Sequence, residues 1–235
     1  MTPSRAPRVA ACANQIMQRA GLLQNPYFVS LANGSMSKDV FRVSQEQFFF
    51  AVRYFPCPMA ALIARMPDPT SRLDLLHNLV EEHGDFRPEQ FHQNTFLAFL
   101  ASIGGQNPEA AGITPLPAVH AFNAVLMAAC ACDEIEVGVG CLGIIERAFA
   151  DISALIGAAV VQRGWVAPGD LVHYALHAEL DIRHAEEFFA VVESKWDDRG
   201  RRGLIEQGLE LGVYAFDRLY RDLAHGPEPG RSRAE

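Results

Sequence analysis

The run His177-Ala-Glu-Leu-Asp181-Ile-Arg-His184 is the most informative stretch of the sequence. In a helix, which turns by about 100° per residue, its steps of four and seven place the two histidines and Asp181 within an arc of about 60°. Two imidazoles and a carboxylate on one helix face can bind Fe, Mn, Zn or Cu. A polar helix face or a buried hydrogen-bonded network is the alternative, and this run by itself does not decide between them.

Helical periodicity also dominates the rest of the chain, whereas strand signals are nearly absent. The pattern predicts an all-α, single-domain bundle of about seven to eight helices over residues 1–225, with a disordered tail at 226–235. Residues 25–43 are expected to be irregular, and Ser44-Gln-Glu-Gln47 to be a capping box that opens a long helix. Pro56 and Pro58 should kink that helix. Further helices are expected at about 5–22, 88–104, 134–163, 168–196 and 201–224. Two more helices are expected, one that ends near residue 83 and one that ends at residue 132.

Composition excludes several classes of function. The 235 residues are 49% hydrophobic and 20% charged, with a formal charge of -8, so no basic surface is expected for nucleic acid. No apolar run reaches the roughly 18 to 20 residues that span a bilayer, and no signal peptide is recognisable, so a cytoplasmic protein without a membrane span is expected. The five cysteines lack CxxC spacing and are interpreted as buried reduced thiols: Cys12, Cys57, Cys130, Cys132 and Cys141.

Three more residues extend the metal-binding pattern to other helices. Glu146 ends the apolar run Val137-Gly-Val-Gly-Cys-Leu-Gly-Ile-Ile145, where a buried carboxylate needs a partner such as a metal, an arginine or a backbone cap. Glu82 closes a predicted helix, and His92 shares the core-facing stripe of the next one. Nitrogen and carboxylate ligands without thiolate suit iron or manganese better than structural zinc, and helical bundles build di-iron sites in their interior.

The order of these motifs resembles the haem-oxygenase-like di-iron oxidases, a superfamily that also contains pyrroloquinoline-quinone synthase and thiaminase-type folds. The resemblance covers residues 27–193 and rests on Asn78-Leu-Val-Glu-Glu82, His92, Leu142-Gly-Ile-Ile-Glu146 and the His-x3-Asp-x2-His run. It implies that two Fe(II) ions, or an Fe/Mn pair, are bound by six residues: Glu82, His92, Glu146, His177, Asp181 and His184. Glu81 and Glu89 remain alternatives to Glu82 as the first carboxylate.

The resemblance further implies an O2-dependent oxidase or oxygenase for a small organic substrate derived from an amino acid or a fatty acid, in a natural-product or specialised pathway. A homodimer and an external electron donor are compatible with it. One alternative is a metal-free member of the same fold, either a cofactor-ring oxidase or a thiaminase-like hydrolase with Cys130, Cys132 or Cys141 as nucleophile. Another is a non-catalytic protein that binds a metal or ligand. His173, one turn before His177, is open to a structural role, to a role as a spare ligand and to a role as a hydrogen-bond donor.

Overall fold

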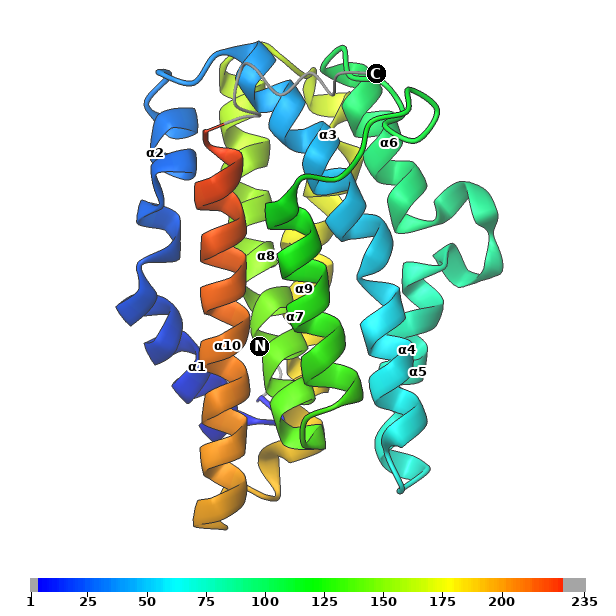
Figure 1. Ribbon diagram of the computed structural model, residues 1–235, viewed down its shortest axis with the longest axis vertical. Helices are drawn as coiled ribbons and strands as arrows, with labels where there is room; N and C mark the ends of the chain where they lie inside the picture. Colours follow the sequence, from blue (N-terminus) through cyan, green and yellow to red (C-terminus); the bar gives the residue numbers. More distant parts are fainter. Residues whose placement is uncertain (1–3, 226–235) are drawn as a thin grey trace.

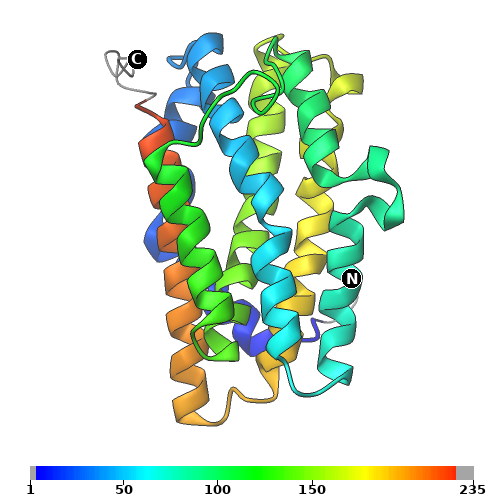
Figure 2. The ribbon, with the colours of Figure 1, turned by 45° about the vertical axis from the view of Figure 1, so that its right-hand side comes forward.

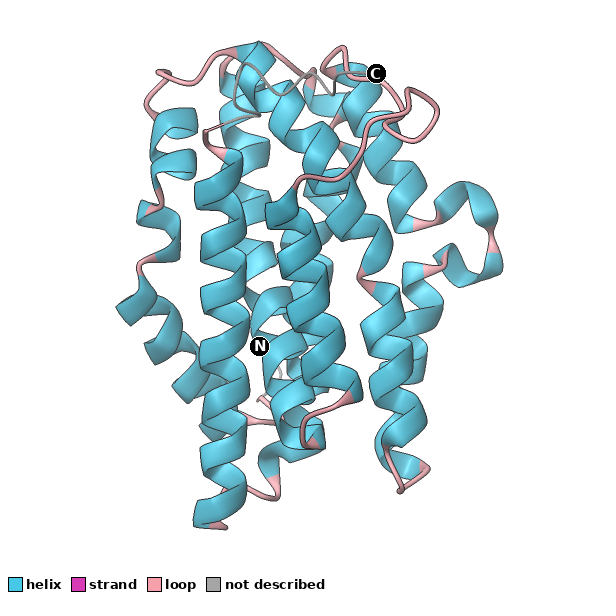
Figure 3. Ribbon diagram, in the orientation of Figure 1, coloured by secondary structure: helices cyan, strands magenta, loops and turns pink. Residues whose placement is uncertain are grey.

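The computed structural model describes residues 4–225, and within that range it contains helices and connecting segments but no strand (Figures 1 and 3). The all-α prediction is thus confirmed, while the tail predicted at 226–235 lies outside the described residues. The α-helices are α1 (Pro7–Ala20), α2 (Pro26–Ala32), α3 (Lys38–Tyr54), α4 (Pro56–Arg65), α5 (Leu73–Glu82), α6 (His92–Ser102), α7 (Pro117–Ala131), α8 (Ile135–Gln162), α9 (Val172–Glu193) and α10 (Arg199–Leu223).

The longest helix, α8, lies at the centre and packs along both α9 and α10. Its neighbours run roughly parallel to it along the long axis of the molecule (Figures 1 and 2). Glycines permit the close approach, since a Cβ on Gly208 would lie 2.3 Å from the carbonyl oxygen of Val137. A Cβ on Gly143 would similarly lie 2.8 Å from the Phe189 ring. The apolar surface of α8 is therefore buried on most sides, as its sequence predicts.

The prediction for residues 25–43 is wrong, because this stretch contains α2 and the first turn of α3. The side chain of Asn25 accepts a hydrogen bond from the Tyr27 amide at 3.0 Å and caps α2. Ser37 caps α3 in the same way, by accepting from the Val40 amide at 3.2 Å. Ser44 instead lies buried inside α3, where its hydroxyl donates to the Phe41 carbonyl at 2.6 Å. The capping pattern at Ser44 was thus misleading, since the helix had already begun at Lys38.

The expected kink at the proline pair is present. Helix α3 ends at Tyr54, and α4 starts at Pro56 with Phe55 still in helical geometry between them.

The segment Lys38–Arg65 is long and apolar enough to cross a membrane by length and composition alone. Buried core helices pass the same test, and 44% of the most apolar window of this segment is buried inside the protein.

The connection between α5 and α6 folds back sharply and projects from the side of the bundle (Figures 1 and 2). Asp85 and Phe86 have positive φ angles of 51° and 66°, and Gly84 has a φ of 56°. A Cβ on Gly84 would lie 2.5 Å from the backbone of Gln90, so glycine is required where the two ends of the loop meet. This reversal brings the start of α6 beside the end of α5.

Candidate metal centre

All six residues singled out in the sequence face the same region of the interior. Glu82 is the last residue of α5, His92 the first of α6, and Glu146 lies in the middle of α8, while the other three lie on α9. None of the six is more than 7% exposed. The carboxylates and imidazoles therefore share a site that is almost inaccessible to water.

Helix α9 continues without interruption through the His-x3-Asp-x2-His run, so its three polar residues share one face. His177 Nδ1 lies 2.8 Å from Asp181 Oδ1. His184 Nδ1 lies 3.9 Å from the same oxygen. The sequence-predicted arc is thus present, and Asp181 lies between the two imidazoles.

The loop reversal after α5 places His92 against both Glu82 and α9. The Nδ1 atom of His92 lies 3.0 Å from Glu82 Oε1. Its ring is 4.5 Å from the ring of His177, measured between centroids. Helices α5, α6 and α9 therefore meet at this point.

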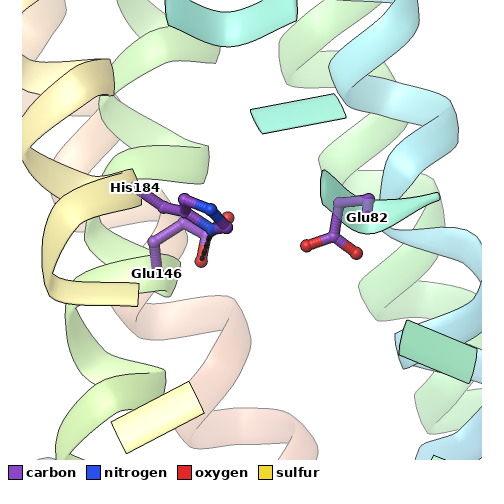
Figure 4. A group of neighbouring side chains, drawn as sticks. All are labelled: Glu82, Glu146 and His184. Carbon is purple, nitrogen blue, oxygen red and sulfur yellow. Dashed lines mark ion pairs between the residues drawn. The ribbon is translucent and has the colours of Figure 1, made fainter. Parts of the chain in front are cut away.

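Glu146 approaches the site from α8, opposite Glu82 (Figure 4). Its Oε2 atom lies 3.7 Å from His184 Nδ1. Glu82, Glu146 and His184 each offer one donor atom, and these three atoms lie within 4.8 Å of one another. Such a spacing allows a single cation to bind side chains from α5, α8 and α9 together.

The buried polar atoms of the predicted ligands test whether a metal fits this site. Five buried donor or acceptor atoms of the predicted ligands make no aligned hydrogen bond, although His92 Nδ1 lies 3.0 Å from Glu82 Oε1: His92 Nδ1, Glu146 Oε1, His177 Nε2, Asp181 Oδ2 and His184 Nδ1. Leaving one such group unpaired in a protein interior costs about 1–3 kcal/mol, and more when it is charged. A cation bound by nitrogen and carboxylate oxygen would satisfy them together, so the residues present fit a metal such as iron or manganese.

The pKa values of the two glutamates, Glu82 and Glu146, are shifted in opposite directions. Burial and the nearby charge of Asp181 raise the pKa of Glu146 to about 8. Burial lowers the pKa of His184, but Glu146 more than reverses that effect and raises it to about 10. For Glu82, burial raises the pKa, yet His92 outweighs it and holds the pKa below its usual range. The metal-free site thus retains protons that a bound cation would displace.

Glu81 lies next to the ligand set but makes different contacts from Glu82. Its Oε2 accepts a hydrogen bond from His184 Nε2 at 3.0 Å, and it also pairs with Arg183 Nη2 at 2.6 Å. Arg183 bridges on to Glu187 at 3.1 Å. Glu89 is exposed on the projecting loop. Sequence reasoning missed the contact between Glu81 and His184, for which the only signal was an acid adjacent to a predicted ligand.

A cavity adjoins the ligands. Apolar side chains make up most of its wall: Phe48, Ala51, Val52, Phe55, Phe122, Ile145, Phe149 and Phe216. Glu82, His92, Glu146, His177 and Asp181 complete the wall together with His173. A small apolar molecule in this cavity would therefore lie directly beside the predicted ligands.

The cysteines lie elsewhere in the described part of the chain, where all five are free thiols and none lines this cavity. Cys130 and Cys141 are buried as predicted, whereas Cys57 and Cys132 are exposed and correct the expectation of buried thiols. Burial raises the pKa of the Cys141 thiol to about 12, and it also raises that of Cys130. Both thiols are therefore poor nucleophiles at neutral pH.

Comparison with known proteins also indicates an iron-binding protein. A family model described as "iron-containing redox enzyme" matches residues 44–215. The chain is 26% identical over 203 residues to a 4-aminobenzoate synthase of Chlamydia trachomatis, covering 86% of this chain and 87% of that protein.

Solved structures share the fold at low sequence identity. A CADD-like protein of unknown function from Nostoc punctiforme superposes with a TM-score of 0.77 at 15% identity, covering 93% of this chain and 96% of that one. A domain of unknown function with a haem-oxygenase-like fold from Shewanella denitrificans has a TM-score of 0.72 at 18% identity, with coverages of 92% and 89%. The haem-oxygenase-like fold expected from the sequence is confirmed.

Proposed function

The chain belongs to the family of iron-containing redox enzymes, and on that premise we propose that it is an O2-dependent, non-haem di-iron oxidase or oxygenase for a small organic substrate. The observation that carries the proposal is the set of five buried polar atoms without a hydrogen bond, which three helices, α6, α8 and α9, bring together. Without a metal these atoms would be left unsatisfied in a site closed to water.

Two Fe(II) ions, or an Fe/Mn pair, would be held by six residues: Glu82, His92, Glu146, His177, Asp181 and His184. Glu146 would contribute a carboxylate from α8, beside His184 and opposite Glu82. Once bound, the metals supply the electrons and the open coordination positions that activate O2. The contacts of Glu81 with His184 and Arg183 support Glu82 as the first carboxylate.

The protein's own groups orient the ligands. Because Glu81 accepts the Nε2–H of His184, the Nδ1 atom of that ring faces Glu146 and Asp181. Asp181 pairs with Nδ1 of His177 and leaves its Nε2 free. Carboxylates that fix an imidazole in this way select its tautomer and raise its basicity as a ligand. The phenylalanines of the cavity wall exclude water from the space beside the metals.

The substrate is proposed to derive from an amino acid or a fatty acid and to belong to a specialised biosynthetic pathway. Relatives named 4-aminobenzoate synthase support a biosynthetic role. The apolar cavity supports a substrate whose reacting part is small and largely uncharged.

The test is oxygen reactivity after anaerobic reconstitution with Fe(II). The wild-type protein should consume O2 and change its optical spectrum on mixing, and His184→Ala and Glu146→Ala should abolish the change while far-ultraviolet circular dichroism shows the helices intact. Glu179→Ala is the matched control, because Glu179 is exposed on the same helix. A wild-type protein whose spectrum does not respond to O2 would contradict the proposal.

A further inference from the structure

His173 is a buried polar residue that the proposed metal site does not use. It is fully buried on α9, one turn before His177, and the two rings lie 4.2 Å apart. Its Nδ1 atom lies 2.9 Å from Thr95 Oγ1, whereas its Nε2 atom is buried without any partner. Among the described residues no carboxylate pairs with this ring, so its burial favours the neutral form.

The hydrogen bonds of Thr95 determine which nitrogen of His173 carries the proton. The hydroxyl of Thr95 donates its only hydrogen to the His92 carbonyl at 2.9 Å. Its oxygen can therefore only accept from His173, which places the proton of the neutral ring on Nδ1. Nε2 is then an unprotonated acceptor that has nothing to accept from.

Aromatic rings pack against His173. Among the residues that line the cavity beside the metal site, His173 is the one polar residue outside the predicted ligand set. The Phe96 and Phe149 rings lie 4.9 and 6.2 Å from its ring. Val52 and Glu82 also line a neighbouring cavity of about 140 Å³, which adjoins this one.

We propose that His173 Nε2 accepts a hydrogen bond from an O–H or N–H group of the substrate and holds that group beside the metal ligands. The substrate would accordingly carry a hydrogen-bond donor at its reacting end and an otherwise apolar, uncharged body. The inference rests on the proposed function, because it takes this cavity as the substrate site. A polar acceptor buried without a partner selects ligands that supply the missing donor and rejects isosteres that lack it.

The test compares 1-hexanol with 1-fluorohexane, two probes of similar shape of which only the alcohol has a donor. Binding is measured by isothermal titration calorimetry on metal-free protein and on protein loaded with redox-inert Zn(II). The wild type should prefer the alcohol, and His173→Phe should reduce the ratio of the two dissociation constants about fivefold, the usual net worth of one hydrogen bond. His173→Gln, which retains an acceptor, should restore part of the preference.

Three results would overturn the inference: an unchanged ratio in His173→Phe, binding of neither probe, or loss of a bound metal ion in His173→Phe, which would make His173 a ligand. Nitrogen-15 NMR of the zinc-loaded wild type provides a test that needs no variant. It should show His173 protonated at Nδ1 and not at Nε2, and the opposite tautomer would also overturn the inference. Failure of the proposed function would give a different result. The protein would then bind no iron or take up no O2, while the metal-free protein would still prefer 1-hexanol to 1-fluorohexane.

Discussion

Replacing Glu81 by glutamine tests how the protein orients a metal ligand through a neighbouring carboxylate. Glu81 contacts two donors at once, since its Oε2 lies 3.0 Å from His184 Nε2 and its carboxylate pairs with Arg183 at 2.6 and 2.8 Å. Glutamine has one acceptor oxygen and one NH2 group. If the oxygen takes the place of Oε2 and faces His184, the NH2 group takes the place of Oε1 and the 2.6 Å contact with Arg183 is lost. In the opposite orientation the contact with His184 is lost.

The expected magnitude follows from these contacts. A hydrogen bond to a charged group contributes about 1.5–3 kcal/mol, and the carboxylate of Glu81 is mostly shielded, with 17% of its side chain exposed. Losing the carboxylate should lower the affinity of the ion held by His184 by roughly 10- to 100-fold. Affinity would be measured by anaerobic Fe(II) titration against a competing chelator. Glu89→Gln is the control, because Glu89 is exposed on the projecting loop and should bind iron like the wild type.

Two results would refute this reasoning. Wild-type affinity in Glu81→Gln would mean that Glu81 does not orient His184. Complete loss of one iron, with no binding even at high Fe(II), would mean that Glu81 is itself a ligand and that Glu82 has been assigned wrongly.

Other predictions concern pH, packing and thiols. Because burial and Asp181 raise the pKa of Glu146 from 4.5 to about 8, the folded metal-free protein holds a proton that the unfolded chain releases. Its free energy of unfolding should therefore fall as pH rises through that window, in urea titrations at several pH values, and a rise would contradict the account. Gly208→Ala should destabilise the protein by about 1–3 kcal/mol, whereas Gly203→Ala, with no atom within 4 Å of the added Cβ, should stabilise it by up to about 1 kcal/mol. Iodoacetamide should alkylate exposed Cys57 and Cys132 without reducing O2 uptake, and inactivation would instead favour a thiol nucleophile.

The sequence was most informative where a helix repeats its pattern locally. Steps of four and seven were enough to place His177, Asp181 and His184 on one face, because an uninterrupted helix fixes those directions. The burial of Glu146 followed from the apolar run before it. Local patterns were less reliable at helix ends, where Ser37 begins the helix that Ser44 was expected to begin.

Contacts between helices could not be predicted in the same way. Whether Glu81 or Glu82 faces the site depends on how α5 ends and packs against α9, and neighbouring residues on a helix differ by about 100° in direction. The acceptor role of His173 likewise depends on Thr95, which lies 78 positions away on α6. The sequence left His173 open to a structural role, a role as a spare ligand and a role as a donor, whereas the packing of α6 against α9 makes its Nε2 an acceptor.

The central claim is that the buried carboxylates and imidazoles hold two iron ions. The most direct measurement is metal analysis of protein reconstituted anaerobically with Fe(II) and freed of unbound metal. The account predicts about two irons per chain, with clear loss of iron in His184→Ala and Glu146→Ala. Fewer than about one iron per chain in the wild type would contradict it.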